Sequence, residues 1–342
     1  MAPRRPRPAA RVLAGVCAGA ASLALSGCMT GAEAESAAAT STAPTQEPTL
    51  SIESEGGAPL QVLQLPQGFE PEGIAADEQT AYVGSLKNGR IVAIDLADGT
   101  RSTAVKGDGT PSLGMALDDD GRLWVAGGDD GDLAVFDPAS GELLTRYQLG
   151  GRGVSFINDV VVGEDAAYVT DSQQPRIFTV PLEDGELPDR GAVQDVALTG
   201  EWEQGGGFGA NGIETTRDGA AVLVVNTTTG TLYRVPTTAQ GGEEPGAATA
   251  VDLDGADLTN GDGMVRDGRY LYVVRNRSNS VVELRLDEGD ASGVWMQEFD
   301  SPEFDVPTTI ALVDNTFLLP NARFGTPDPR NAGYQVVLIP QP

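Results

Sequence analysis

Short apolar runs alternate with polar, glycine-rich turns along this chain, and one three-residue phrase recurs among them. In most copies the phrase is a polar residue, then a small one, then an aliphatic one, and it opens an apolar strand. The copies are 72–74 (EGI), 113–115 (LGM), 158–160 (NDV), 211–213 (NGI), 262–264 (DGM) and 308–310 (TTI). Their central residues are separated by 41, 45, 53, 51 and 46 residues, a spacing that indicates six structural repeats.

Each repeat follows the same order of elements. A polar turn follows the phrase, then come a second strand, a Gly- or Asn-rich loop, a third strand and a more variable fourth, as at 193–198. Second strands are expected at 81–83, 123–125, 167–169, 222–224 and 270–272, and third strands at 91–95, 133–137, 177–181, 232–236 and 281–286. No segment has a convincing helical period. The pattern predicts an all-β, six-bladed β-propeller with four-stranded blades, and six near-equal repeats disfavour a two-sheet sandwich.

The last repeat supplies only three strands, near 310–313, 317–320 and 335–339. Residues 60–65 form a spare apolar strand ahead of the first phrase. We expect this N-terminal strand to complete the last blade and cover its open edge. The predicted propeller domain is therefore 60–342.

Residues 1–28 have the character of a targeting segment. Basic residues precede an apolar run at 12–25, which is too short to span a bilayer comfortably. The run ends in Leu-Ser-Gly-Cys28, which resembles the lipobox of bacterial lipoproteins, whose cysteine is lipidated; the alternative is an ordinary cleaved signal. Residues 29–59 contain few large apolar side chains and are expected to be a disordered tether. An extracytoplasmic protein, lipid-anchored to the bacterial cell membrane, is predicted.

Composition excludes several classes of function. The chain contains no His, which excludes Ser-His-Asp triads and His-based zinc sites. Its formal net charge is −28, and becomes −32 without residues 1–28, which argues against nucleic-acid partners. Both cysteines, Cys17 and Cys28, precede the predicted domain, so disulfides are not expected there.

The first residue of four phrases carries a side-chain oxygen. The innermost strand of each propeller blade lines the central channel, so Glu72, Asn158, Asn211 and Asp262 would converge on one spot, with Leu113 and Thr308 in the other two sectors. An oxygen-only ligand set favours Ca²⁺. The glycines that follow three of these residues (Gly73, Gly212 and Gly263) are expected to let the backbone turn sharply. The alternative is that these are turn residues that merely begin strands.

These phrases resemble those of the senescence marker protein (regucalcin), gluconolactonase and luciferin-regenerating-enzyme family. The order Glu, Asn, Asn, Asp in blades one, three, four and five is the most specific part of the resemblance, which covers about 60–342. It implies a six-bladed propeller with a channel calcium held by Glu72, Asn158, Asn211 and Asp262. It also implies a calcium-dependent hydrolase of lactones, esters or phosphotriesters, with Asp262 as the first catalytic candidate and Glu72 as the second; whether Asp262 is base or nucleophile stays open.

The sequence departs from the family around the expected pocket. Sugar lactonases of the family carry an Arg two residues before the blade-three Asn, where this chain has Phe156, which favours a more apolar substrate. Trp202 and Phe208, on the loop before Asn211, are expected to wall the pocket, with loop packing as the alternative. Polar residues that end second strands are expected around the same mouth, with turn capping as the alternative: Asp171, Asn226, Asn276 and Asn321.

A second hypothesis is a non-catalytic binding scaffold with structural calcium or none, because several strands also resemble the YVTN and NHL repeats of extracellular binding proteins. A pocket that is open above the four oxygens would favour the enzyme, and a plugged one the scaffold. As an enzyme, the protein is expected to act as a monomer on a small-molecule substrate, without nucleic acid, and to contact membrane only through lipid on Cys28.

Replacement of the predicted lipidation site tests the anchor. The variant Cys28→Ser should move from the membrane fraction to the soluble fraction, because no other segment of the sequence is expected to hold the protein at a membrane. Fractionation with metabolic labelling by a palmitate analogue measures both effects. Retention of unlabelled Cys28→Ser in the membrane at high salt would contradict the lipobox interpretation.

Overall fold

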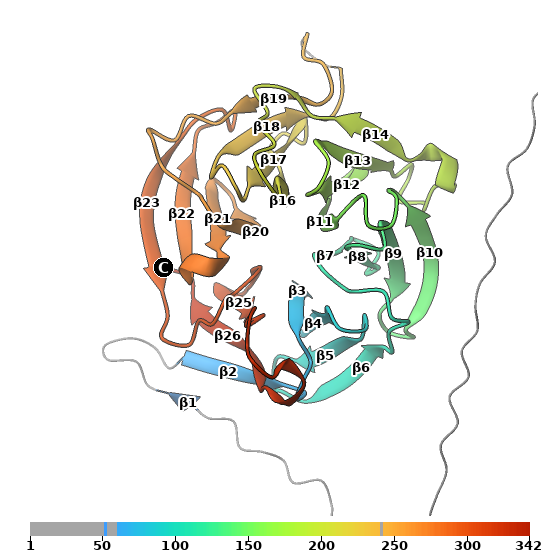
Figure 1. The fold of residues 1–342 in the computed structure, drawn as a ribbon, viewed down its shortest axis with the longest axis vertical. Helices are drawn as coiled ribbons and strands as arrows, with labels where there is room; N and C mark the ends of the chain where they lie inside the picture. Colours follow the sequence, from blue (N-terminus) through green and yellow to red (C-terminus); the bar gives the residue numbers. More distant parts are fainter. Residues whose placement is uncertain (1–50, 53–59, 240–241) are drawn as a thin grey trace, which may run out of the picture. The chain divides into compact units, whose positions relative to one another are not determined.

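Six β-sheets form a ring around a central channel (Figure 1). This computed structural model describes residues 51–52, 60–239 and 242–342. The predicted six-bladed β-propeller is confirmed. The predicted leader, the lipobox with Cys28 and nearly all of the tether lie outside the described residues. No helix in the described part of the chain is long and apolar enough to cross a bilayer.

The blades are numbered in chain order from the first complete sheet. Blade one contains β3 (Pro71–Ala76), β4 (Thr80–Ser85), β5 (Ile91–Asp95) and β6 (Arg101–Val105). Blade two contains β7 (Met115–Leu117), β8 (Leu123–Ala126), β9 (Asp132–Asp137) and β10 (Glu142–Gln148). Blade three contains β11 (Ile157–Val162), β12 (Ala166–Asp171), β13 (Arg176–Pro181) and β14 (Gln194–Ala197).

The second half of the ring follows the same order. Blade four contains β16 (Ala210–Thr215), β17 (Ala221–Asn226), β18 (Leu232–Pro236) and β19 (Ala247–Ala250), with β15 (Thr199–Gly200) parallel to β19 at its edge. Blade five contains β20 (Gly261–Asp267), β21 (Tyr270–Arg275), β22 (Ser280–Leu286) and β23 (Gly293–Asp300). Blade six contains β24 (Ala311–Val313), β25 (Thr316–Pro320), β26 (Tyr334–Pro340), β2 (Leu60–Leu65) and β1 (Ser51–Ile52). Three short 3-10 helices complete the described elements: η1 (Arg190–Ala192), η2 (Asn276–Ser278) and η3 (Pro329–Asn331).

Apolar layers between neighbouring blades form the core. Every residue of β12 and of β17 is buried, which explains why these strands are nearly continuous apolar runs rather than alternating ones. Tyr168 of blade three, for example, belongs to the same buried cluster as Val224 of blade four. Each blade is thus stabilised mainly by burial against its neighbours.

An N-terminal strand closes the ring, as the sequence predicts. Residues of β2 pair antiparallel with β26, from Gln61 opposite Leu338 to Leu65 opposite Tyr334. The edge of blade six is therefore paired by a segment far away in the sequence. Strand β1, which falls inside the predicted tether, pairs in turn with β2, so strand pairing begins before residue 60.

The glycines of the recurring phrase have a different role from the one expected. None of Gly73, Gly212 and Gly263 has a positive φ, so the predicted sharp backbone turn is wrong. Instead, a Cβ at Gly73 would overlap the carbonyl oxygen of Leu113, and a Cβ at Gly212 would overlap that of Asp262. These glycines are required because the inner strand of the next blade lies against them.

This close approach makes a stability prediction. The change Gly212→Ala should lower the free energy of unfolding by about 1–3 kcal/mol, the usual cost of overpacking a well-packed site. Gly289→Ala is a matched control, since a Cβ there would meet no atom within 4 Å. Urea denaturation of both variants measures the difference. Equal stability of the two variants would contradict the packing argument.

Candidate functional site

The six phrases lie side by side around the channel. The amide of Gly114 donates a hydrogen bond to the carbonyl of Asn158 in the next blade (2.9 Å), and the amide of Gly263 donates to the carbonyl of Thr308 (2.9 Å). The Thr308 hydroxyl in turn donates to the carbonyl of Glu72 (2.7 Å), which joins blade six to blade one. Equivalent positions in the sequence are therefore neighbours in space.

A β-bulge marks the phrase in the four blades that carry an oxygen ligand candidate. At each of these points, two residues of the first strand lie opposite a single residue of the second strand. The bulges lie between Pro71 and Ile74, Ile157 and Val160, Ala210 and Ile213, and Gly261 and Met264. A bulge redirects a side chain from the usual alternation. The four candidate residues therefore lie within their strands, not just ahead of them as predicted, and the bulge turns them toward the channel.

Glu72, Asn158, Asn211 and Asp262 line one cavity of about 730 Å³. Their exposed fractions are 6%, 7%, 7% and 5%, so all four are buried at its floor. The structure thus brings the predicted ligand set together in one place.

Hydrogen bonds fix two of these side chains. The Asn158 amide nitrogen donates to the Ser172 hydroxyl (2.8 Å), which fixes the orientation of the amide group. The Asn276 amide nitrogen donates to Asp262 Oδ2 (2.6 Å). By contrast, Glu72 Oε2 is buried and accepts no hydrogen bond from any residue that the structure describes. A buried carboxylate oxygen without a partner is costly, so a cation at this point would satisfy it.

The carboxyl groups of the site repel one another. Burial, followed by the charges of Asp262 and Asp159, raises the pKa of Glu72 well above its ordinary value. Burial is also the main reason that the pKa of Asp262 rises to about 8, although hydrogen bonds from Asn276 and Asn211 lower it. Burial raises the pKa of Asp159 to about 7. A bound divalent cation would relieve this repulsion.

The donor chemistry suits a hard cation. No group of three or more Cys, Asp or Glu side chains in the described ranges is arranged to hold a metal ion. The candidate set is different in kind, because two of its four oxygens come from amides. Carboxylate and amide oxygens, with positions left for water, are the ligands that Ca²⁺ takes.

Asp159 is a residue whose role the sequence reasoning missed. It occupies the small-residue position of its phrase, where four other copies have Gly. Its Oδ1 accepts the amide of Val160 (2.9 Å) and its Oδ2 the amide of Ile213 in blade four (3.3 Å). Asp159 therefore joins blades three and four. A carboxylate where the other repeats have Gly was the available signal.

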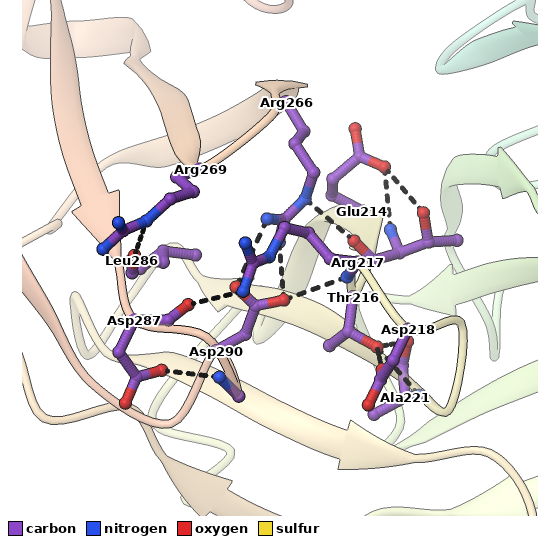
Figure 2. Close-up of polar contacts among 12 residues, drawn as sticks. Glu214, Thr216, Arg217, Asp218, Ala221, Arg266, Arg269, Leu286, Asp287 and Asp290 are labelled. Atoms are coloured by element: carbon purple, nitrogen blue, oxygen red, sulfur yellow. Dashed lines mark hydrogen bonds and ion pairs between the residues drawn. The ribbon is translucent and has the colours of Figure 1, made fainter.

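A cluster of Asp and Arg residues away from the cavity contains a buried carboxylate that, unlike Glu72, has protein partners for both oxygens (Figure 2). Both oxygens of the buried Asp290 contact the Arg266 guanidinium (3.2–3.3 Å), and Oδ2 also accepts the Arg217 amide (3.0 Å). Arg266 Nε donates to the carbonyl of Thr215, so the cluster ties blade five to blade four. With its hydrogen bonds satisfied inside the protein, Asp290 is structural.

Some of the predicted pocket residues line the cavity. Phe156 and Phe208 lie there with their ring centroids 4.8 Å apart, and Phe208 is 44% exposed. Asn276 also lines the cavity while it contacts Asp262. The wall is therefore partly aromatic, with polar groups below.

The other predicted pocket residues do not line the cavity. Trp202 packs on Tyr233 instead, with ring centroids 4.7 Å apart. The remaining three are buried and cap or brace turns: Asp171 pairs with Arg176, Asn226 accepts the amides of Thr228 and Thr229, and Asn321 accepts the amide of Asp305. Strand-end Asn and Asp commonly satisfy backbone amides in this way, which was the alternative for these positions.

Comparison with known proteins identifies the family resemblance. Residues 71–173 match the family model described as SMP-30/Gluconolactonase/LRE-like region. The resemblance, expected over about 60–342, is confirmed for 71–173, a stretch that includes Glu72 and Asn158 and ends before Asn211 and Asp262. No curated protein matches the sequence.

Solved structures share the fold. A calcium-binding protein, regucalcin, from Agrobacterium tumefaciens is 20% identical, with a TM-score of 0.59 over 82% of this chain and 92% of that one. A gluconolactonase from Xanthomonas campestris is 18% identical, with a TM-score of 0.56 over 86% and 95%. Virginiamycin B lyase from Staphylococcus aureus is 15% identical, with a TM-score of 0.54 over 82% and 99%. At these identities the likeness extends to the fold alone.

The raised pKa of Asp262 predicts how the metal-free protein responds to pH. The folded protein holds this proton up to about pH 8, whereas the ordinary value is 3.8. The folded state therefore binds more protons than the unfolded chain, and the free energy of unfolding should fall as pH rises through this window. With excess chelator at pH 9, Asp262→Asn should be more stable than the unsubstituted protein in thermal unfolding.

Asp119→Asn is the matched control, because Asp119 is exposed on a turn and its replacement should change stability little. Saturating calcium should reverse the order of stabilities, since only the unsubstituted site keeps both carboxylates. Lower stability of Asp262→Asn in chelator at pH 9 would contradict the electrostatic argument.

Proposed function

We propose that this protein is a calcium-dependent hydrolase of a lactone, ester or phosphotriester. The observation that carries the proposal is the floor of the cavity, where four bulged strands place Glu72, Asn158, Asn211 and Asp262 together. The unpartnered Glu72 Oε2 supports a cation there. Two carboxylates and two amide oxygens would balance the charge of one Ca²⁺ and leave positions for water or substrate.

The chain's own residues supply acid–base chemistry and orientation. A calcium ion, when bound, supplies positive charge that stabilises a carbonyl or phosphoryl oxygen as negative charge develops on it. Asp262 is the first candidate to activate water or attack directly, because Asn276 holds one of its oxygens in a fixed position. Glu72 is the second candidate. The geometry is compatible with Asp262 as base or as nucleophile.

The open cavity favours an enzyme over a scaffold. A binding scaffold with structural calcium needs no space above the ion, yet about 730 Å³ lies over these four residues. The Xanthomonas campestris relative in fold is a gluconolactonase. A histidine-to-alanine variant of the Staphylococcus aureus lyase is catalytically inactive, and this chain has no His. These points together favour hydrolysis over that lyase chemistry.

The cell-surface setting is part of the same proposal. Lipid on Cys28 and the segment 29–59 would hold the propeller outside the cytoplasm, near the membrane. The acidic composition of the domain suits a solvated extracytoplasmic protein that does not bind anionic lipid through its surface. A small-molecule substrate would then reach the cavity from the surrounding medium.

Two substitutions separate catalysis from metal binding. Asp262→Asn keeps one ligand oxygen but removes the charge and the proton acceptor, so hydrolysis should fall by about 10²-fold or more at saturating calcium. Asn211→Ala removes a neutral ligand and its hydrogen bond to Asp262 but keeps both carboxylates, so its activity should recover partly with excess calcium. Initial rates on lactones, aryl esters and organophosphates, with calcium titrations by calorimetry, measure both effects.

The contrast between the variants decides the roles. Full turnover by Asp262→Asn at saturating calcium would exclude Asp262 as the catalytic group. Unchanged calcium affinity in both variants would exclude the proposed metal site and favour the scaffold.

A further inference from the structure

The wall of the cavity differs in character from one side to the other. Phe156 precedes β11 in blade three and packs on Phe208, while Leu113 lines the wall at blade two. Arg277, in η2 after β21 of blade five, lines the opposite part of the same cavity. In a six-bladed ring, blades two and three face blades five and six across the channel (Figure 1). An apolar side thus faces a cationic side across the oxygen-rich floor.

Arg277 is the cationic residue among those that line this cavity. Its guanidinium lies 5.9 Å from the ring centroid of Phe324 in blade six, and in the described part of the chain it forms no ion pair or hydrogen bond. Arg275, two residues earlier, is paired with Glu298 (2.9 Å). The guanidinium of Arg277 is therefore placed by an aromatic face with its donors free for a ligand.

The position of Arg277 links it to the proposed chemistry. Its backbone amide donates to Asn276 Oδ1 (2.6 Å), and the same Asn276 side chain donates to Asp262. Arg277 thus follows directly the residue that holds Asp262, and it lines the same cavity as the floor carboxylates. Across the cavity, the exposed Asp129 of blade two would repel an anion at the other end and so fix the substrate's direction.

We infer that the substrate carries an anionic group, a carboxylate or a phosphate, which Arg277 binds while the Phe156–Phe208 pair holds an apolar part. This inference rests on the proposed function, because the calcium ion would balance the floor carboxylates and leave the charge of Arg277 for the substrate. Arg277 is thus a specificity-determining residue for amphiphilic anionic esters or lactones. The Arg fork matches both carboxylate and phosphate geometry.

A matched pair of probes tests the anionic group. The 4-nitrophenyl ester of adipic acid, with its second carboxyl free, is compared with the same ester in which that carboxyl is methylated. The free acid should have a kcat/KM about tenfold or more above that of the neutral ester, the scale of a charge-assisted hydrogen bond. Arg277→Gln should remove this preference while leaving kcat/KM for the neutral ester nearly unchanged.

Arg285→Gln is the matched control, because Arg285 is exposed on β22 and does not line the cavity. It should keep the preference for the anionic ester. Thermal unfolding of Arg277→Gln should match the unsubstituted protein, since the exposed side chain makes no ion pair to lose. Equal kcat/KM for the two esters, or an equal loss on both in Arg277→Gln, would overturn the inference.

A binding measurement keeps this test separate from the proposed function. The two 4-nitroanilides that correspond to these esters react far more slowly, and their affinities can be measured by calorimetry in the presence of calcium. The anionic anilide should bind about tenfold tighter, and only in proteins that keep Arg277. Equal binding would overturn the anionic substrate class. Absence of ester turnover with intact selective binding would instead overturn hydrolysis alone.

Discussion

The close approach of the six inner strands is the constraint on which the site depends. Glycines such as Gly73 and Gly212 have no room for a Cβ because the next blade's backbone lies against them. The same packing brings the first residues of the six phrases next to one another. Side chains far apart in the sequence therefore meet at the floor of one cavity, and the bulges direct four of them into it.

The electrostatics of the floor oppose the stability of the metal-free fold. Glu72 and Asp262 are buried together, and Asp159 adds a third negative charge nearby. Elsewhere the chain satisfies such a carboxylate internally, as Arg266 and Arg217 do for Asp290. The floor of the cavity lacks such a cationic partner from the protein among the residues described. Unfavourable burial of this kind is typical of sites that bind a charged ligand.

Much of the fold was predictable because the same pattern of strands and turns recurs six times in the sequence. Strands β5 and β18 match their expected bounds, and the closing strand β2 was visible as an apolar run without a blade. The convergence of Glu72 and Asp262 also followed from repeat register. The pocket wall was less predictable. The position of a loop residue such as Trp202 depends on packing contacts, here with Tyr233, that the repeat pattern does not specify. Arg277 was missed for the same reason.

The two sectors without an oxygen ligand explain the form of the cavity. Thr308 has a hydroxyl, but it is fully buried and donates to the carbonyl of Glu72, so it belongs to the seam between blades six and one. Leu113 in blade two offers only an apolar side chain, which lines the cavity. The floor beside Leu113 is thus apolar, whereas the exposed Asp129 of the same blade supplies a carboxylate to the cavity wall. Under the proposed function, a substrate's apolar part would lie there against Leu113 and Phe156 while its reacting oxygen faces the candidate metal ligands. Blade three would then contribute to both roles, because Phe156 lines the wall and Asn158 belongs to the floor.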